Sequence, residues 1–222
     1  MNISTDQIVL WQYGFININA TLIYTWFVMA ILILLAILTK KSILKSDIIG
    51  KTENFFEILT NVIQEQIKSI TSIQFDKVFP FITCLFLFIL ISNLISLVPY
   101  FSSPTASLST TFALMSLVVV FSVGIGIKHK GFSSYISKYI KPVPFMLPLN
   151  IISDIISNFS LAFRLYGNIM SGGIVATILN KVSFLSIGFP IIINLLAVIT
   201  GVIQAYVFTI LSMIFLSSAD SD

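Results

Sequence analysis

Long apolar stretches constrain this chain more than any other feature, because about 20 consecutive apolar residues suffice to cross a bilayer. Five such stretches occur, three of ordinary length at 20–39, 78–98 and 105–127 and two longer ones at 143–180 and 187–217. Hydrophobic residues make up 57% of the chain and charged residues only 9%, whereas a typical soluble domain has about 25% charged residues. The sequence therefore predicts an all-α polytopic membrane protein with about five crossings, folded as a single membrane domain over residues 1–222.

The segment 50–72 differs from these stretches because it mixes charged and apolar residues at helical spacing. Glu53, Glu57 and Glu65 lie between apolar residues that recur every three or four positions. A helix with this pattern lies along a membrane face or against a partner. We therefore expect residues 50–72 to form an interfacial amphipathic helix that does not cross the bilayer.

Lysines beside the apolar stretches predict the orientation. They gather at 40–51 and 128–141, and cytoplasmic loops of membrane proteins are enriched in Lys and Arg. Alternating crossings then place residues 1–19 and a turn near Lys181 outside the cell, and the C-terminus in the cytoplasm. Because the net charge of +3 comes from these flanking lysines, no nucleic-acid partner is expected. The single cysteine, Cys84, excludes an internal disulfide.

The last two stretches exceed the thickness of the bilayer. At about 1.5 Å per residue, a continuous helix over 143–180 reaches about 55 Å, against a hydrocarbon layer of about 30 Å. A helix that overshoots this layer tilts, breaks or lies partly in the interface. We expect 143–180 and 187–217 to form a long, strongly tilted hairpin.

Arg164 is the only arginine of the chain, and it falls within the first long stretch. A guanidinium keeps its proton in proteins, so Arg164 cannot become neutral in apolar surroundings. A charge at the bilayer centre costs at least about 2.5–3.5 kcal/mol and marks a functional site by default. Arg164 is therefore the leading candidate for a functional residue.

Polar side chains share the helical face of Arg164. At about 100° per residue, six of them fall within about 40° of it: Asn150, Ser153, Ser157, Ser160, Asn168 and Ser171. Asp154, the only carboxylate within a predicted crossing, lies beside this stripe, and Gly167, Gly172 and Gly173 permit close approach by another element. Small and polar residues also line ordinary packing faces between membrane helices. Helix packing alone therefore explains the serines, but it does not explain the arginine.

The second long stretch carries a matching face of small and polar residues at spacings of three and four: Ala197, Thr200, Gly201 and Gln204. The amide of Gln204 both donates and accepts hydrogen bonds. We expect Gln204 to be the hydrogen-bonding neighbour of the Arg164 guanidinium across the hairpin.

These motifs resemble a known family. The segments Ser160-Leu-Ala-Phe-Arg164-Leu-Tyr-Gly-Asn168 and Val202-Ile-Gln204-Ala-Tyr resemble the signature hairpin of subunit a of the rotary F-type ATP synthases. Ile91-Ser-Asn93-Leu-Ile-Ser-Leu-Val-Pro99 and Pro144-Phe-Met-Leu-Pro148 agree with it, so the resemblance covers nearly the whole chain. The opening Asp6-Gln-Ile-Val-Leu-Trp11 and Gly167-Asn-Ile-Met-Ser171-Gly are most similar to the bacterial N-ATPase branch.

The resemblance implies a stator that conducts H⁺ or Na⁺ through two half-channels past a rotating ring of c subunits. Arg164 takes the position of the essential arginine, which releases the ion from a ring carboxylate and blocks leakage, with Asn168 and Gln204 as polar neighbours. The implied partners are the c-ring, b-type peripheral stalk subunits and the remainder of the ATP synthase complex. The resemblance further implies a bacterial plasma (inner) membrane location, no catalytic activity of the chain on its own, and no cofactor or bound metal.

Two positions depart from the family pattern. Many members carry an ionisable residue nine positions after the arginine or seven before the glutamine, where this chain has Gly173 and Ala197. Our candidates for the ion path are therefore Asn150, Asp154, Ser157, Asn168, Ser171 and Asn194. Hard cations accept hydroxyl and carbonyl oxygens as ligands, so a path of neutral oxygens favours Na⁺. The c-ring, however, mainly determines which ion is carried.

Three other classes of protein remain as alternatives. A stand-alone secondary transporter or ion channel is expected to show paired discontinuous spans or a mid-membrane solute site, and no repeat between the two halves of the chain supports this. An intramembrane enzyme needs a nucleophile or metal constellation, and the sequence contains no H-E-x-x-H, no G-x-S-x-G and no phosphate-binding loop. A purely structural anchor would tolerate the loss of Arg164.

Overall fold

The structure, a computed structural model, describes residues 9–13, 16–45, 51–70, 75–96, 103–131, 145–179 and 189–220. Its helices are α1 (Ala20–Lys45), α2 (Lys51–Ile70), α3 (Phe75–Ile95), the short 3₁₀ helix η2 (Pro104–Ala106), α4 (Leu108–Lys130), α6 (Met146–Leu179) and α7 (Phe189–Asp220). The predicted all-α membrane fold is confirmed. α6 and α7 are the longest helices in the described ranges, with 34 and 32 residues, as the lengths of the last two apolar stretches led us to expect.

A small β-hairpin precedes the first helix, and the sequence analysis did not predict it. Strands β1 (Val9–Tyr13) and β2 (Ile16–Asn19) pair antiparallel, with Tyr13 opposite Ile16. Both strands are rich in the β-branched and aromatic residues that favour extended structure. The sequence predicted only an external terminus over 1–19, because strands of five and four residues carry a weak signal.

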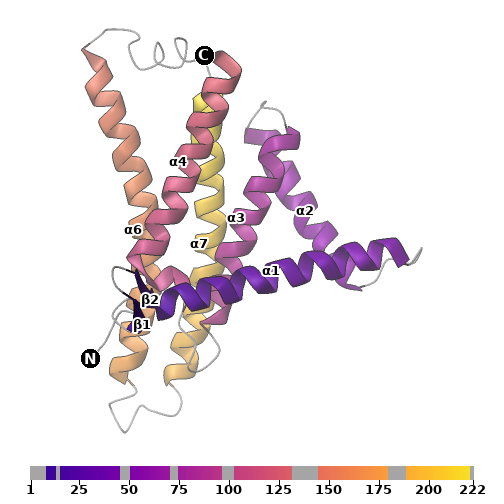
Figure 1. The fold of residues 1–222 in the computed structure, drawn as a ribbon, viewed down its shortest axis with the longest axis vertical. Helices are drawn as coiled ribbons and strands as arrows, with labels where there is room; N and C mark the ends of the chain where they lie inside the picture. Colours follow the sequence, from indigo (N-terminus) through magenta and orange to yellow (C-terminus); the bar gives the residue numbers. More distant parts are fainter. Residues whose placement is uncertain are drawn as a thin grey trace.

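Four helices are long and apolar enough to cross a membrane, by length and composition, in the described part of the chain. Their apolar stretches are Ala20–Ile37, Val78–Ile95, Leu108–Lys128 and Leu195–Ser218, which lie in α1, α3, α4 and α7. α6 is not among them in a search confined to the described residues. A crossing by α6 therefore stays a prediction, which its course alongside α4 and α7 supports (Figure 1).

The helices form a bundle in which α7 is central. Figure 1 shows α4, α6 and α7 running along the long axis of the molecule, and α7 contacts α6, α3 and α4. α1 instead runs across this axis. Among the described side chains of α1 only Ala20, Thr21 and Val28 are buried. Trp26, Ile33 and Ile37 of the same helix are exposed in the described structure.

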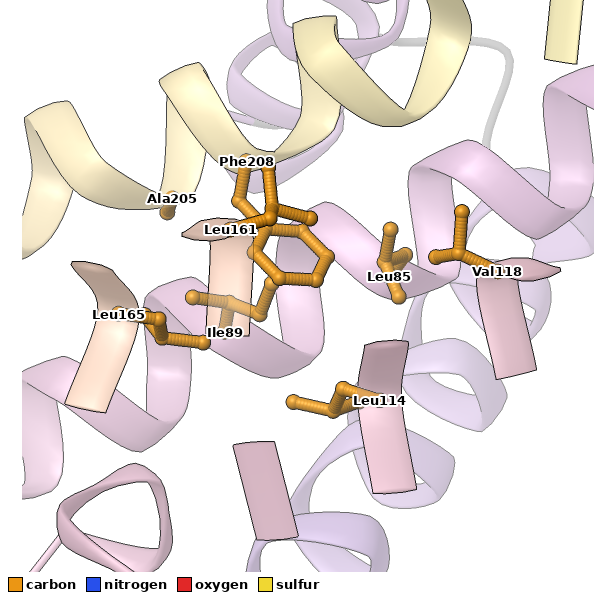
Figure 2. Close-up of a cluster of buried hydrophobic side chains, with 8 residues drawn as sticks. All are labelled: Leu85, Ile89, Leu114, Val118, Leu161, Leu165, Ala205 and Phe208. Carbon is orange, nitrogen blue, oxygen red and sulfur yellow. The ribbon is translucent and has the colours of Figure 1, made fainter. Parts of the chain in front are cut away.

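Two clusters of buried apolar side chains hold the bundle together. One brings together α3, α4, α6 and α7 around Phe208 (Figure 2), and consists of Leu85, Ile89, Leu114, Val118, Leu161, Leu165, Ala205 and Phe208. The other attaches the amphipathic helix α2 to α3, α4 and α7 through Ile63 and Ile67. α2 therefore packs on its own chain through one face, while Ile58 and Val62 on the same helix remain exposed.

Candidate functional site

Arg164 lies near the middle of α6, with its side chain exposed. The next residue, Leu165, is 0% exposed and belongs to the buried cluster around Phe208 (Figure 2). Because successive helical side chains are about 100° apart, packing of Leu165 into the bundle turns Arg164 outwards. Within the described ranges, no hydrogen bond or ion pair holds the guanidinium. The structure thus presents a fixed cation on the exposed surface of α6.

A hydrogen bond across the hairpin lies one turn from Arg164. Asn168 Nδ2 donates to Gln204 Oε1 at 2.9 Å. Our prediction that Gln204 pairs with the Arg164 guanidinium is therefore wrong: Gln204 is 3% exposed and points into the α6–α7 contact, whereas Arg164 faces outwards. The second polar atom of this amide, Gln204 Nε2, has no hydrogen-bond partner in the part of the chain that the structure describes.

Gly172 brings the two helices close together one turn further along the hairpin. A Cβ atom at Gly172 would lie 3.4 Å from the Cβ of Ala197, which is ordinary van der Waals contact. Gly167 and Gly173 have no neighbouring heavy atom within 4 Å of such a Cβ in the described structure. Close approach through glycine therefore occurs within the hairpin at Gly172. At Gly167, one turn from Arg164, and at Gly173 the helix surface stays open in the described structure.

The predicted polar stripe of α6 follows the uncovered side of the helix. Ser157, Asn168 and Ser171 are exposed, whereas Asn150 and Asp154 are half-buried. The Ser171 hydroxyl donates to the Asn168 backbone carbonyl at 3.1 Å, so its hydrogen is used within the helix. The structure thus brings the candidate residues on α6 onto one side of the helix, but it does not gather them around a single point. Asn194 lies on α7, and its side chain is outside the described residues.

One polar residue of α6 that we did not single out is buried. Asn158 is 6% exposed, and its Nδ2 donates to the backbone carbonyl of Asp154 at 2.8 Å. It lies one residue past Ser157 and therefore off the arginine face. Its burial depends on the neighbouring helices, which helical periodicity within α6 does not reveal.

A second polar feature missed by the sequence analysis anchors α7 from the other side. Asn93 near the end of α3 donates to the carbonyl of Gly201, at 2.8 Å, and accepts from the Thr105 hydroxyl, also at 2.8 Å. Gly201 lies three residues before Gln204, on the face that we predicted would meet α6. In the structure this face is shared, because Ala197 and Gln204 contact α6 whereas Gly201 contacts α3. The available signal was an asparagine within an apolar span.

The fold and the site together define a class: a helical membrane protein whose longest helix pair presents a fixed, outward-facing cation in its apolar zone. Known relatives make the assignment specific. The family model of the ATP synthase A chain matches residues 22–217. The chain therefore belongs to the ATP synthase subunit a family, the non-catalytic membrane subunit of the complex.

Individual relatives match over nearly the full length of the chain. It is 42% identical to ATP synthase subunit a 2 of Acaryochloris marina, over 99% of this chain and 93% of that protein. It is 42% identical to ATP synthase subunit a 1 of Crocosphaera subtropica, over 98% and 94% respectively. Identity to ATP synthase subunit a of Nitrosospira multiformis is 36%, over 100% and 88%. These relatives support the stator role over that of a stand-alone transporter, and assignment to the N-ATPase branch stays a prediction.

Proposed function

We propose that this chain is the ion-conducting stator of a rotary ATP synthase and that Arg164 is the fixed charge past which the c-ring turns. The observation that carries the proposal is the outward-facing Arg164, which has no hydrogen-bond or ion-pair partner in the described chain. A permanent cation in an apolar zone is stable only with an anionic or strongly polar partner. A ring of subunits that carry membrane-embedded carboxylates supplies such a partner.

The electrostatics explain how Arg164 controls ion release. A ring carboxylate that faces lipid stays neutral with its ion bound, because an isolated anion in an apolar medium is very costly. At about 4 Å and an effective dielectric constant of about 20, two opposite unit charges attract by about 4 kcal/mol. This energy changes an equilibrium constant for ion release about a thousandfold. Opposite Arg164 the carboxylate is therefore stabilised as an anion and releases its ion. The same charge repels a bare cation that moves directly between the two half-channels.

The polar side of α6 is the proposed lining of the ion path. Its members are Asn150, Asp154, Ser157, Asn168 and Ser171, joined by Asn194 on α7. The positions that are often ionisable in relatives hold Gly173 and Ala197, and Ala197 packs against Gly172. The path in this chain therefore relies on hydroxyl and amide groups and on one carboxylate, Asp154. Either H⁺ or Na⁺ is compatible with such a lining, and neutral oxygen ligands favour Na⁺.

Orientation and assembly complete the proposal. The lysine clusters at 40–51 and 128–141 favour an external N-terminus and a cytoplasmic C-terminus in a bacterial plasma membrane. Figure 1 shows the hairpin β1–β2 in the lower half of the molecule and the end of α7 near its top. The largely uncovered helix α1 is a surface available to lipid or to b-type stalk subunits.

Replacement of Arg164 tests the proposal. We expect Arg164→Ala complexes, purified and reconstituted into vesicles, to assemble but to lose ATP-driven ion uptake. Arg164→Lys keeps the charge but loses the planar fork of donors, and we expect it to retain at most a small part of the activity. Lys128→Ala, which removes an exposed cation of α4, is the matched control and should pump normally. Normal pumping by assembled Arg164→Ala complexes would overturn the proposal.

A further inference from the structure

A series of buried hydrogen bonds connects the segment after α3 with α7. Asn93 Nδ2 donates to the carbonyl oxygen of Gly201 at 2.8 Å, across 108 positions of sequence. Thr105 Oγ1 donates to Asn93 Oδ1 at 2.8 Å, and the Ser103 hydroxyl lies 2.6 Å from that of Thr105. All four residues are buried. The carboxamide of Asn93 is thus held by η2 and its flanking residues on one side and bonded to α7 on the other.

The direction of every bond in this series follows from its last acceptor. A carbonyl oxygen only accepts, so the nitrogen of the Asn93 amide must face Gly201 and its oxygen must face Thr105. Thr105 then uses its single hydroxyl proton on Asn93, and Ser103 must donate to Thr105. Removal of the Thr105 hydroxyl therefore deprives the Asn93 oxygen of this donor and loosens the orientation of its amide.

At Gly201, α3 and α7 lie so close together that almost no room remains for a side chain on α7. A Cβ atom at Gly201 would lie 3.0 Å from the Cβ of Asn93 and 3.4 Å from its Cγ and Nδ2. Any residue larger than glycine requires α7 or Asn93 to move. The contact between the two helices therefore combines a steric fit with a directed hydrogen bond.

This contact lies between the two places where α7 meets α6. Gly201 follows Ala197, which packs against Gly172, by four residues, and precedes Gln204, which accepts from Asn168, by three. Helices in lipid gain no hydrophobic driving force from pairing, so packing and interhelical hydrogen bonds fix their register. We propose that Asn93 is a positioning residue: held by Thr105, it fixes the register of α7 at which Gln204 meets Asn168 beside Arg164.

The inference rests on the proposed function of the Arg164 hairpin, so its test needs a readout independent of ion transport. Gly172 and Ala197 provide one, because their 3.4 Å Cβ separation is close to the Cβ separation of about 3.8 Å in a disulfide. In a Cys84→Ser background, the pair Gly172→Cys and Ala197→Cys should therefore cross-link rapidly in assembled complexes treated with copper phenanthroline. The rate reports the register of α6 against α7.

We expect Asn93→Leu to slow this cross-link at least about threefold, the average worth of an interhelical hydrogen bond in a membrane protein. Thr105→Val replaces the hydroxyl with a methyl group and should also slow the cross-link. Thr105→Ser keeps a hydroxyl and should leave the cross-linking rate unchanged. Ser96→Ala is the matched control, since the Ser96 hydroxyl donates to a carbonyl of its own segment, that of Asn93, at 2.6 Å. It should leave the rate unchanged.

A second readout ties register to coupling. In complexes without the introduced cysteines, Asn93→Leu and Thr105→Val should lower the number of ions moved per ATP hydrolysed, whereas Thr105→Ser should not. Unchanged cross-linking in Asn93→Leu and Thr105→Val would overturn the inference even if Arg164→Ala abolishes pumping. Conversely, normal pumping by Arg164→Ala would remove the proposed function and leave the register effect standing. If Asn93→Leu does not assemble, the Thr105→Val and Thr105→Ser pair decides the outcome.

Discussion

Unequal effects on stability are predicted for the two partners of the Asn168–Gln204 hydrogen bond. Gln204 is 3% exposed, and Asn168 Nδ2 is its one hydrogen-bond partner in the described structure. Asn168→Leu leaves a buried amide with no partner, which costs about 1–3 kcal/mol. Gln204→Met removes the buried amide altogether and leaves only the exposed Asn168 unpaired. We therefore expect Gln204→Met to be close to neutral and Asn168→Leu to be clearly destabilising.

The assay is the denaturant midpoint at which purified complexes in lipid nanodiscs release this chain. The double variant should resemble Gln204→Met alone, so the coupling energy between the two sites equals the cost of Asn168→Leu, about 1–3 kcal/mol. The hydrogen bond from the Ser171 hydroxyl goes to the backbone of Asn168 and is kept in both variants. Its loss therefore does not contribute to a difference between their midpoints. A Gln204→Met variant that is as unstable as Asn168→Leu would refute the reasoning, since it would mean that the Gln204 amide is satisfied by another partner.

Two further pairs of variants test the packing around the site. Ile67 is 1% exposed, and Ile67→Ala should destabilise the attachment of α2 by about 2–5 kcal/mol. Ile58 is 56% exposed, and Ile58→Ala should have little effect. The accessibility of α2 to protease in the complex distinguishes the two variants. Gly172→Val should separate α6 from α7 and lower stability by about 1–3 kcal/mol. Gly124→Val, where no neighbouring atom lies within 4 Å in the described structure, should be tolerated in the same denaturation assay.

The sequence was most informative where periodicity and length decide the outcome. Alternation of charged and apolar residues in 50–72 predicted an amphipathic helix, and α2 spans Lys51–Ile70. The lengths of the last two apolar stretches predicted the long helices α6 and α7. The isolated charge of Arg164 singled out one residue, because no arrangement of neighbouring helices makes a guanidinium neutral.

Sequence reasoning was least informative about partners across helices. Helical spacing placed Gln204 and Gly201 on one face, but it could not reveal that α6 covers Gln204 while α3 covers Gly201. The expected bond from Gln204 to Arg164 failed for this reason, since packing of Leu165 into the bundle turns the guanidinium outwards. The structural role of Asn93 was not predicted, because its partner lies 108 positions away. The β1–β2 hairpin was not predicted, because two short strands carry a weak signal beside long apolar stretches.

The position of the Arg164 guanidinium in the complete complex tests the central claim most directly. A structure of the assembled complex in a bilayer should place this guanidinium within about 4–6 Å of a c-ring carboxylate, the range over which an opposite charge stabilises the ionised form. A guanidinium directed at lipid headgroups or bulk water, with the ring carboxylates elsewhere, would contradict the account.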